Sequence, residues 1–171
     1  MERLRPQASH RFDTGMLPPD LRGGDTLMPT FRRPAVLAFD VNETVLDIMA
    51  LEPLFLALFG RREAMREWYA QLILHSQAMT LAGAYAPLPA LAAGVLRMMG
   101  TIYSIDIGDA AVADLAAAIK TLPAHADVRP ALERLRAEGF RTVTLTNSAP
   151  DPEMSTLARA GIDDLFERQF S

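Results

Sequence analysis

The feature that most constrains the fold is a short apolar run, residues 34–40 (PAVLAFD), that ends on a carboxylate. A continuous apolar run of this length, opened by a proline and closed by a polar turn, is typical of a strand buried on both faces of a parallel sheet. The turn carries Asn42, Glu43 and Thr44, and apolar residues resume directly after it. The sequence therefore predicts a buried strand whose last residue, Asp40, is held by a tight polar loop.

The pattern after this strand becomes helical. Residues 49–121 show apolar residues at helical spacing and two alanine-rich segments, 89–99 and 110–120, so we expect helices there. A short TIYSI segment, 101–105, is the one candidate strand within the stretch. The length and composition of 49–121 indicate a helical insertion rather than a connecting loop.

Strand and helix alternate again towards residue 171. The expected elements are a helix capped by Asp127 and stopped by Gly139, a strand at 141–146, a helix with Asp151 as its cap and Pro152 at its first position, and a strand within 165–170. This order of elements is typical of an open parallel sheet in an α/β protein.

These patterns predict a division of the chain into three parts. Residues 1–33 are rich in Pro, Gly, Arg and Asp without sustained periodicity, so we expect a disordered extension. Residues 34–48 and 122–171 are expected to form one α/β core. Residues 49–121 are expected to form the helical insertion within it.

Composition narrows the classes of function. The 171 residues carry a formal net charge of −4, which offers no basic surface, so we expect no nucleic-acid partner. The lack of cysteine excludes disulfides, thiolate metal sites and a thiol nucleophile. No secretory signal is visible, and the most apolar stretch is broken by Pro87 and Pro89, so no membrane association is expected. These features favour a cytoplasmic protein.

Polar side chains gather where two predicted strands end. Asp40 and its turn follow the first strand, and Thr146, Asn147 and Ser148 follow the second. Ligands of parallel α/β sheets bind beyond the carboxyl ends of the strands, and sequential strands are usually neighbours. Either turn alone is more often an ordinary turn or helix cap. The two together favour a site in which an ionised carboxylate acts as a nucleophile.

The motifs FDVNETVLD (39–47) and LTNS (145–148) resemble those of the haloacid dehalogenase superfamily of hydrolases, most nearly its type II 2-haloacid dehalogenases. The similarity extends from about residue 34 to 171. It implies a Rossmann-like core with a helical cap inserted after the first motif. It also implies that Asp40 attacks a small-molecule substrate to form a covalent intermediate, which water then hydrolyses.

The resemblance assigns roles to residues around the nucleophile. Thr146 would hydrogen-bond the nucleophile or the substrate, and Asn147 would hold the substrate or the leaving halide. Thr44 lies in the nucleophile loop and would turn towards the site.

A cap arginine of the type II enzymes binds the substrate carboxylate and halide, and this sequence departs from the family there. Alignment by eye places Tyr69 near the position of that arginine. Arg62 and Arg66 lie close by, and the sequence leaves open whether either one reaches the site. On a helix surface such arginines are more often solvated charges.

Asn42 separates two chemistries of the superfamily. Its phosphatases carry a second aspartate two positions after the nucleophile, where it protonates the leaving oxygen. Asparagine has no such proton to give, whereas a halide leaves without one. The residue therefore favours a 2-haloacid dehalogenase, which needs no metal or other cofactor. A magnesium-dependent small-molecule phosphatase is the alternative.

The family pattern continues for several dozen residues beyond Ser171, with a lysine, an acidic motif and further strands. Within residues 34–171 the first strand would form an exposed apolar edge, which favours pairing with another chain, as in a homodimer. An inactive fragment or pseudo-enzyme that works by association is therefore a third interpretation.

Overall fold

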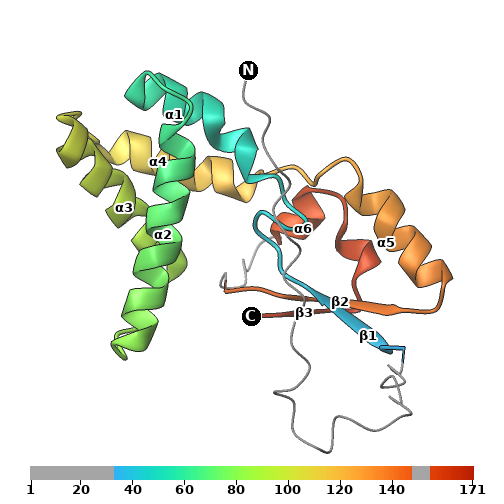
Figure 1. Cartoon of the computed structure of the whole chain (residues 1–171). Helices are drawn as coiled ribbons and strands as arrows, with labels where there is room; N and C mark the ends of the chain where they lie inside the picture. The colour runs from blue at the N-terminus through green and yellow to red at the C-terminus, as the bar shows by residue number, and fades with distance from the viewer. Residues whose placement is uncertain (1–32, 148–154) are drawn as a thin grey trace, which may run out of the picture. The chain divides into compact units, whose positions relative to one another are not determined.

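A computed structural model describes residues 33–147 and 155–171. Three strands form a parallel sheet in the order β1-β2-β3 (Figure 1): β1 (Val36–Phe39), β2 (Arg141–Leu145) and β3 (Arg168–Phe170). In the register, Phe39 pairs with Thr144, and Leu145 pairs with Phe170. The predicted α/β class with a parallel sheet is confirmed, and the predicted extension at 1–33 lies outside the described residues except for Arg33.

Helices fill the chain between β1 and β2. They are the 3-10 helix η3 (Ile48–Leu51), α1 (Glu52–Phe59), α2 (Ala64–Leu81), α3 (Leu88–Tyr103), α4 (Asp109–Lys120) and α5 (Val128–Ala137). The candidate strand TIYSI is wrong, because Thr101–Tyr103 form the last turn of α3, which Ser104 ends at a φ of 56°. The division of the chain into a core and an inserted cap stays a prediction.

The expectation that β1 is buried on both faces is also wrong. Leu37 and Phe39 are half-buried, whereas Val36 is 43% exposed. Figure 1 shows α5 and α6 (Thr156–Arg159) on one side of the sheet. Within the described chain β1 pairs with β2 alone, so it forms the edge strand that the sequence led us to expect. The more covered strand is β2, in which Thr142, Val143 and Thr144 are buried, whereas Arg141 and Leu145 at its two ends are exposed.

The helix ends follow the predicted pattern in part. Gly139, at a φ of 85°, lies just past α5 and suits the left-handed conformation of a helix stop. Asp127 occupies the position before α5, but its side chain makes no capping hydrogen bond. Ser155 caps α6, since its hydroxyl accepts a hydrogen bond from the Ala158 amide at 3.1 Å. The predicted cap Asp151, with Pro152, lies outside the described residues.

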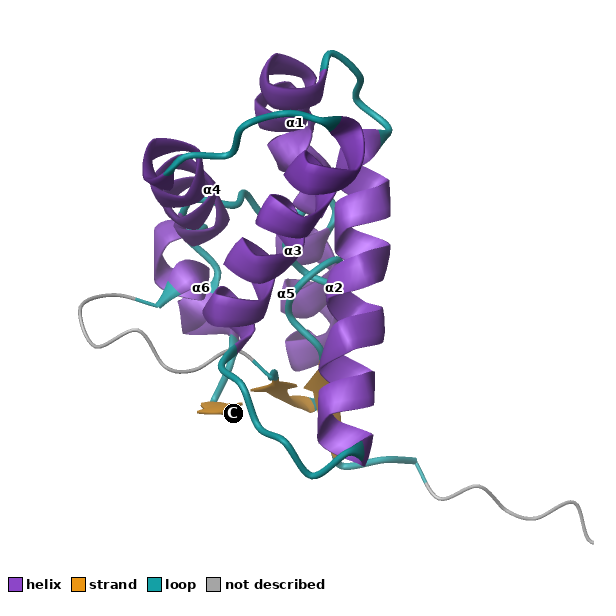
Figure 2. Cartoon of the chain, turned by 90° about the vertical axis from the view of Figure 1, so that its left-hand side faces the viewer, coloured by secondary structure: helices purple, strands orange, loops and turns teal. Residues whose placement is uncertain are grey.

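A cluster of buried side chains joins the helices in the described part of the chain. Helices α2 and α3 lie side by side (Figure 2). Trp68 of α2 is 1% exposed, and its indole Nε1 donates to the Ala92 carbonyl of α3 at 3.1 Å. Gly100 of α3 is buried where the chain doubles back, because a Cβ built there would lie 2.4 Å from Ile107 Cγ1. The turn between α3 and α4 therefore depends on a position without a side chain.

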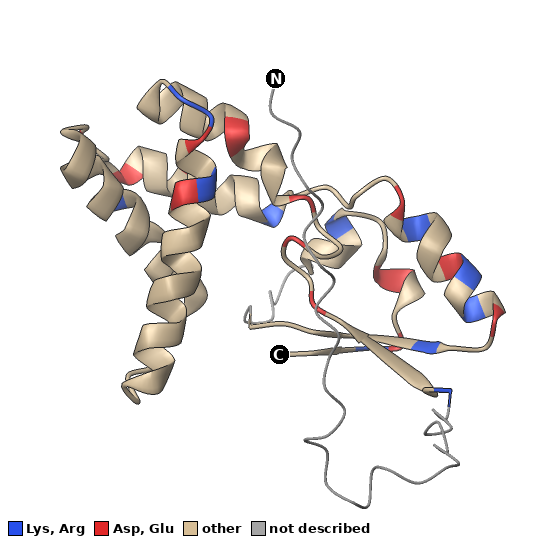
Figure 3. Ribbon diagram, in the orientation of Figure 1, with Lys and Arg blue, Asp and Glu red and all other residues tan. Residues whose placement is uncertain are grey.

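Charged residues are distributed unevenly over the helices. Figure 3 shows Arg and Glu interspersed along α5, whereas the C-terminal half of α2 carries no charged residue. None of the described helices is long and apolar enough to cross a membrane. Single apolar side chains such as Leu74 are exposed on the uncharged part of α2.

Candidate active site

Asp40 lies at the carboxyl end of β1, beside the end of β2. Because Phe39 pairs with Thr144, the residues that follow the two strands leave the sheet at the same edge. The Asp40 carboxylate is exposed, and its Oδ2 accepts a hydrogen bond from Thr44 Oγ1 at 3.1 Å. The hydroxyl of Thr44 therefore orients Oδ2. It makes no hydrogen bond to Oδ1, the other oxygen of the carboxylate.

The turn after Asp40 is closed by its own backbone. The carbonyl of Val41 accepts from the amides of Val45 and Leu46, both at 3.0 Å, and the amide of Glu43 donates to the Leu46 carbonyl at 2.9 Å. Glu43 takes a φ of 64°, a left-handed conformation that is uncommon for a residue with a Cβ. Such conformations cluster at functional sites.

The far side of the turn is fastened to the segment before α5. The amide of Asp47 donates to the Pro123 carbonyl at 2.8 Å, and the amide of His125 donates to the Val45 carbonyl at 3.1 Å. Asp47 also caps η3, because its Oδ1 accepts from the Met49 amide at 2.9 Å. These bonds fix the exit of the chain towards the helices, so the backbone that carries Asp40 is held from both ends.

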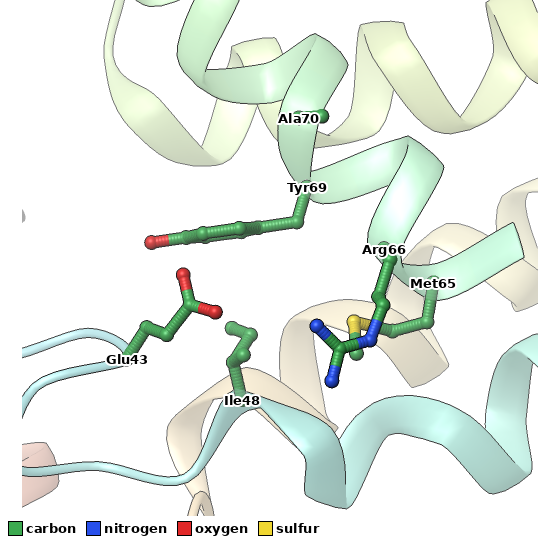
Figure 4. A pocket seen from close by; sticks show the side chains of 6 residues that line it. All are labelled: Glu43, Ile48, Met65, Arg66, Tyr69 and Ala70. Atoms are coloured by element: carbon green, nitrogen blue, oxygen red, sulfur yellow. The ribbon is translucent and has the colours of Figure 1, made fainter. Parts of the chain in front are cut away.

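A pocket lies between the turn and α2 (Figure 4). It has a volume of about 110 Å³ and is lined by Glu43, Ile48, Met65, Arg66, Tyr69 and Ala70. Ile48 and Met65 are buried and form an apolar wall, whereas Glu43 and Arg66 are exposed. The pocket therefore combines an apolar surface with one acidic, one basic and one phenolic group, a composition that suits a small polar molecule.

Of the two arginines that the sequence left open, one lines this pocket and the other does not. Arg62 lies 3.5 Å from the carboxylate of Glu52, so its charge is engaged on the helix surface. Arg66, one turn further along, lines the pocket and makes no ion pair within the described ranges. Of the two, Arg66 is thus the arginine that a ligand in this pocket would meet.

Tyr69 is the second α2 residue at the pocket. Burial, followed by the negative charges of Glu43 and Asp40, raises the pKa of the Tyr69 phenol above its usual value of 10.0. Both carboxylates are therefore close enough to Tyr69 to affect its phenol. The predicted nucleophile Asp40 and the predicted substrate-binding residue Tyr69 thus interact electrostatically.

The remaining predicted site residues are only partly brought together. Thr146 follows β2 and donates its amide to the Phe170 carbonyl at 2.9 Å. Asn147 is exposed, and the adjoining Ser148 lies outside the described residues. Asn42 sits in the nucleophile turn in a bridge to Leu46. Of the predicted site residues only Tyr69 lines the pocket, and the lining does not include Asp40, Thr146, Asn147, Asn42 or Thr44. The roles of all these residues stay predictions.

Two pocket residues were not assigned from the sequence. The sequence predicts Glu43 only as part of the polar turn, and it leaves open whether Arg66 reaches the site. A positive φ is not visible in the sequence at a glutamate, although a polar residue in so tight a turn is a signal for it. Among the residues that the structure describes, no group of three or more His, Cys, Asp or Glu side chains could hold a metal ion.

Similar folds occur among solved structures. The L-2-haloacid dehalogenase from Xanthobacter autotrophicus is 24% identical, with a TM-score of 0.72 over 80% of this chain and 56% of that one. The L-2-haloacid dehalogenase RSc1362 is 26% identical, with a TM-score of 0.73 over 81% of this chain and 64% of that one. The chain thus spans less than two thirds of the length of these proteins. No curated protein matches its sequence.

The similarity to these structures confirms the expected Rossmann-like α/β fold. A family model described as haloacid dehalogenase-like hydrolase matches residues 34–171, from the start of β1 to beyond β3. The match includes Asp40, its turn and the strand end at Thr146. The chain therefore belongs to the haloacid dehalogenase-like hydrolase family.

Proposed function

We propose that this hydrolase removes halide from a short 2-haloalkanoic acid, with Asp40 as the nucleophile. The observation that carries the proposal is the placement of the Asp40 carboxylate at the sheet edge, with Oδ2 hydrogen-bonded to Thr44. An oriented carboxylate on a rigid strand end is what a nucleophilic displacement requires.

The reaction would proceed in two steps. Asp40 Oδ1 attacks C2 of the substrate, a carbon–oxygen bond forms, and halide leaves with the electron pair of the carbon–halogen bond. Water then attacks the carbonyl carbon of the aspartyl ester: one hydrogen of the water stays on the released 2-hydroxy acid, the water oxygen enters the carboxylate of Asp40, and the second proton passes to solvent. Thr44 holds Oδ2 during the attack. Asn42 supplies no acidic proton, and a halide leaving group needs none.

The comparisons support this choice among the reactions of the family. The solved neighbours described above are L-2-haloacid dehalogenases. The Xanthobacter autotrophicus enzyme has also been solved with chloropropionic acid covalently bound. Arg66 supports the same choice for this chain, because a guanidinium in the pocket can bind a carboxylate in a bidentate manner.

The test is chloride release from (S)-2-chloropropionate in the presence of EDTA. We expect release by the wild-type chain and at least a hundredfold loss in Asp40→Asn, since the amide is a poor nucleophile. The matched control is Asp106→Asn, an exposed aspartate just past α3, which should leave the rate unchanged. Chloride release that survives in Asp40→Asn would remove Asp40 from the mechanism.

The same preparation separates the alternative interpretations. Hydrolysis of p-nitrophenyl phosphate that requires added Mg²⁺, without chloride release, would favour the phosphatase. Neither activity, in a chain that unfolds cooperatively, would favour a protein that works by association. A cytoplasmic location and homodimer formation stay predictions.

A further inference from the structure

The pocket at α2 carries two opposite charges that do not neutralise each other. Glu43 enters it from the nucleophile turn and Arg66 from α2 (Figure 4). Neither side chain forms an ion pair with any other residue of the described chain, and the two do not pair with each other. Each charge is therefore available to a ligand.

The position of Glu43 is set by the backbone rather than by side-chain packing. Its φ of 64° and its amide hydrogen bond to the Leu46 carbonyl hold the residue at the tip of the turn. Figure 4 shows its carboxylate directed towards the ring of Tyr69. Burial first, and then the charges of Glu43 and Asp40, raise the pKa of the Tyr69 phenol, so both carboxylates add negative charge near this part of the pocket.

The opposite side of the pocket has the opposite charge. Arg66 lies beside the buried Met65 and Ile48, which are 1% and 4% exposed. Apolar walls of this kind strengthen the field of the charges beside them, even where those charges are exposed on their other side. A substrate that carries only a carboxylate would gain from Arg66 but would be repelled by Glu43 and Asp40.

We propose that this pocket selects a small dipolar substrate, whose carboxylate binds Arg66 and whose ammonium group binds Glu43. The inference rests on the proposed function and narrows its substrate class to short 2-haloacids that also carry an amino group. The cavity volume of about 110 Å³ limits such a ligand to a few heavy atoms. Pockets for drug-sized ligands hold about 300–1,000 Å³.

Binding of unreactive probes tests the pocket apart from catalysis. The probes are β-alanine, which is dipolar, and propionate, which is anionic, titrated into the full chain at pH 7.5 by calorimetry. We expect β-alanine to bind about tenfold more tightly, which corresponds to about 1.4 kcal/mol. Glu43→Gln should abolish this preference for β-alanine. Arg66→Gln should lower the affinity for both ligands.

The control variant is Glu63→Gln, an exposed glutamate at the start of α2 outside the pocket lining, which should change nothing. Equal affinities, tighter binding of propionate, binding of neither probe, or a preference that persists in Glu43→Gln would each overturn the inference.

Turnover distinguishes this inference from the proposed function. Chloride release is compared for 3-amino-2-chloropropionate and 2-chloropropionate, with enzyme-free blanks. A tenfold higher kcat/KM for the amino compound, lost in Glu43→Gln, is the expected result. Dipolar preference in binding without chloride release would refute the proposed function alone, whereas release with a preference for 2-chloropropionate would refute the dipolar pocket alone.

Discussion

Two buried threonines of β2 differ in how their hydroxyls are satisfied. Thr142 Oγ1 donates to the Leu165 carbonyl at 2.5 Å, and Thr142 is 1% exposed. Thr144 is 0% exposed, and its Oγ1 has no hydrogen-bond partner among the described residues. The two residues lie two apart on the same strand and share one face of it. A comparison of valine substitutions at these two positions therefore measures how much one side-chain hydrogen bond contributes to the free energy of unfolding.

The expected changes in the free energy of unfolding have opposite signs. Thr144→Val removes a buried hydroxyl that lacks a partner, a group that costs about 1–3 kcal/mol. We expect the variant to be more stable by about 1 kcal/mol. Thr142→Val leaves the Leu165 carbonyl without its donor, so we expect a loss of about 1–2 kcal/mol.

Urea unfolding measures both changes. The buried Trp68 gives a fluorescence signal, and far-UV circular dichroism reports the whole chain. With a slope of about 2 kcal/mol/M, the midpoint should rise by about 0.5 M in Thr144→Val and fall by about 0.5–1 M in Thr142→Val. Equal losses in the two variants would refute the reasoning, because they would mean that Thr144 has a hydrogen-bond partner as good as that of Thr142.

Two further predictions concern α2 and α3. The raised pKa of Tyr69 means that the folded chain holds the phenol proton more tightly than the unfolded chain does. The contribution of Tyr69 to stability is therefore constant below about pH 10 and is lost as the pH rises through the raised pKa. The fall should be smaller in Tyr69→Phe but not absent, because the hydrogen bond to Glu67 raises the pKa of Tyr103 as well, and urea unfolding between pH 8 and 11 measures the difference. Gly100→Ala should cost about 2 kcal/mol or more, since the new Cβ would meet Ile107 Cγ1 at 2.4 Å. Gly94→Ala in the same helix meets nothing within 4 Å and should instead stabilise by about 0.5–1 kcal/mol; a similar melting temperature in both variants would contradict the close contact.

Local patterns were sufficient for most elements of the fold. The apolar run before Asp40 and the β-branched run at 141–146 both form strands, because their residues favour the extended conformation. The segment TIYSI has similar propensity but lies at the end of an alanine-rich run, so it completes α3 instead. Continuation of an existing helix outweighed the preference of three residues.

The errors concern relations between distant parts of the chain. The apolar composition of β1 suggested burial on both faces, yet Val36 is exposed because strand order, not composition, decides which strand is covered. Likewise the sequence could not choose between Arg62 and Arg66. That choice depends on the Glu52 carboxylate and on the direction of α2 relative to the turn.

The pairing of β1 with β2 has a consequence for the order of folding. Val36 pairs with Arg141, so the sheet joins residues separated by all of α1 to α5. The helical contacts, such as Trp68 with Ala92, close much shorter loops. Long-range parallel pairing forms slowly, since the entropy of closing the loop is lost before the strands stabilise each other. During synthesis the helices can pack as they emerge, whereas Asp40 acquires its sheet edge only after the ribosome has delivered Arg141 to Leu145.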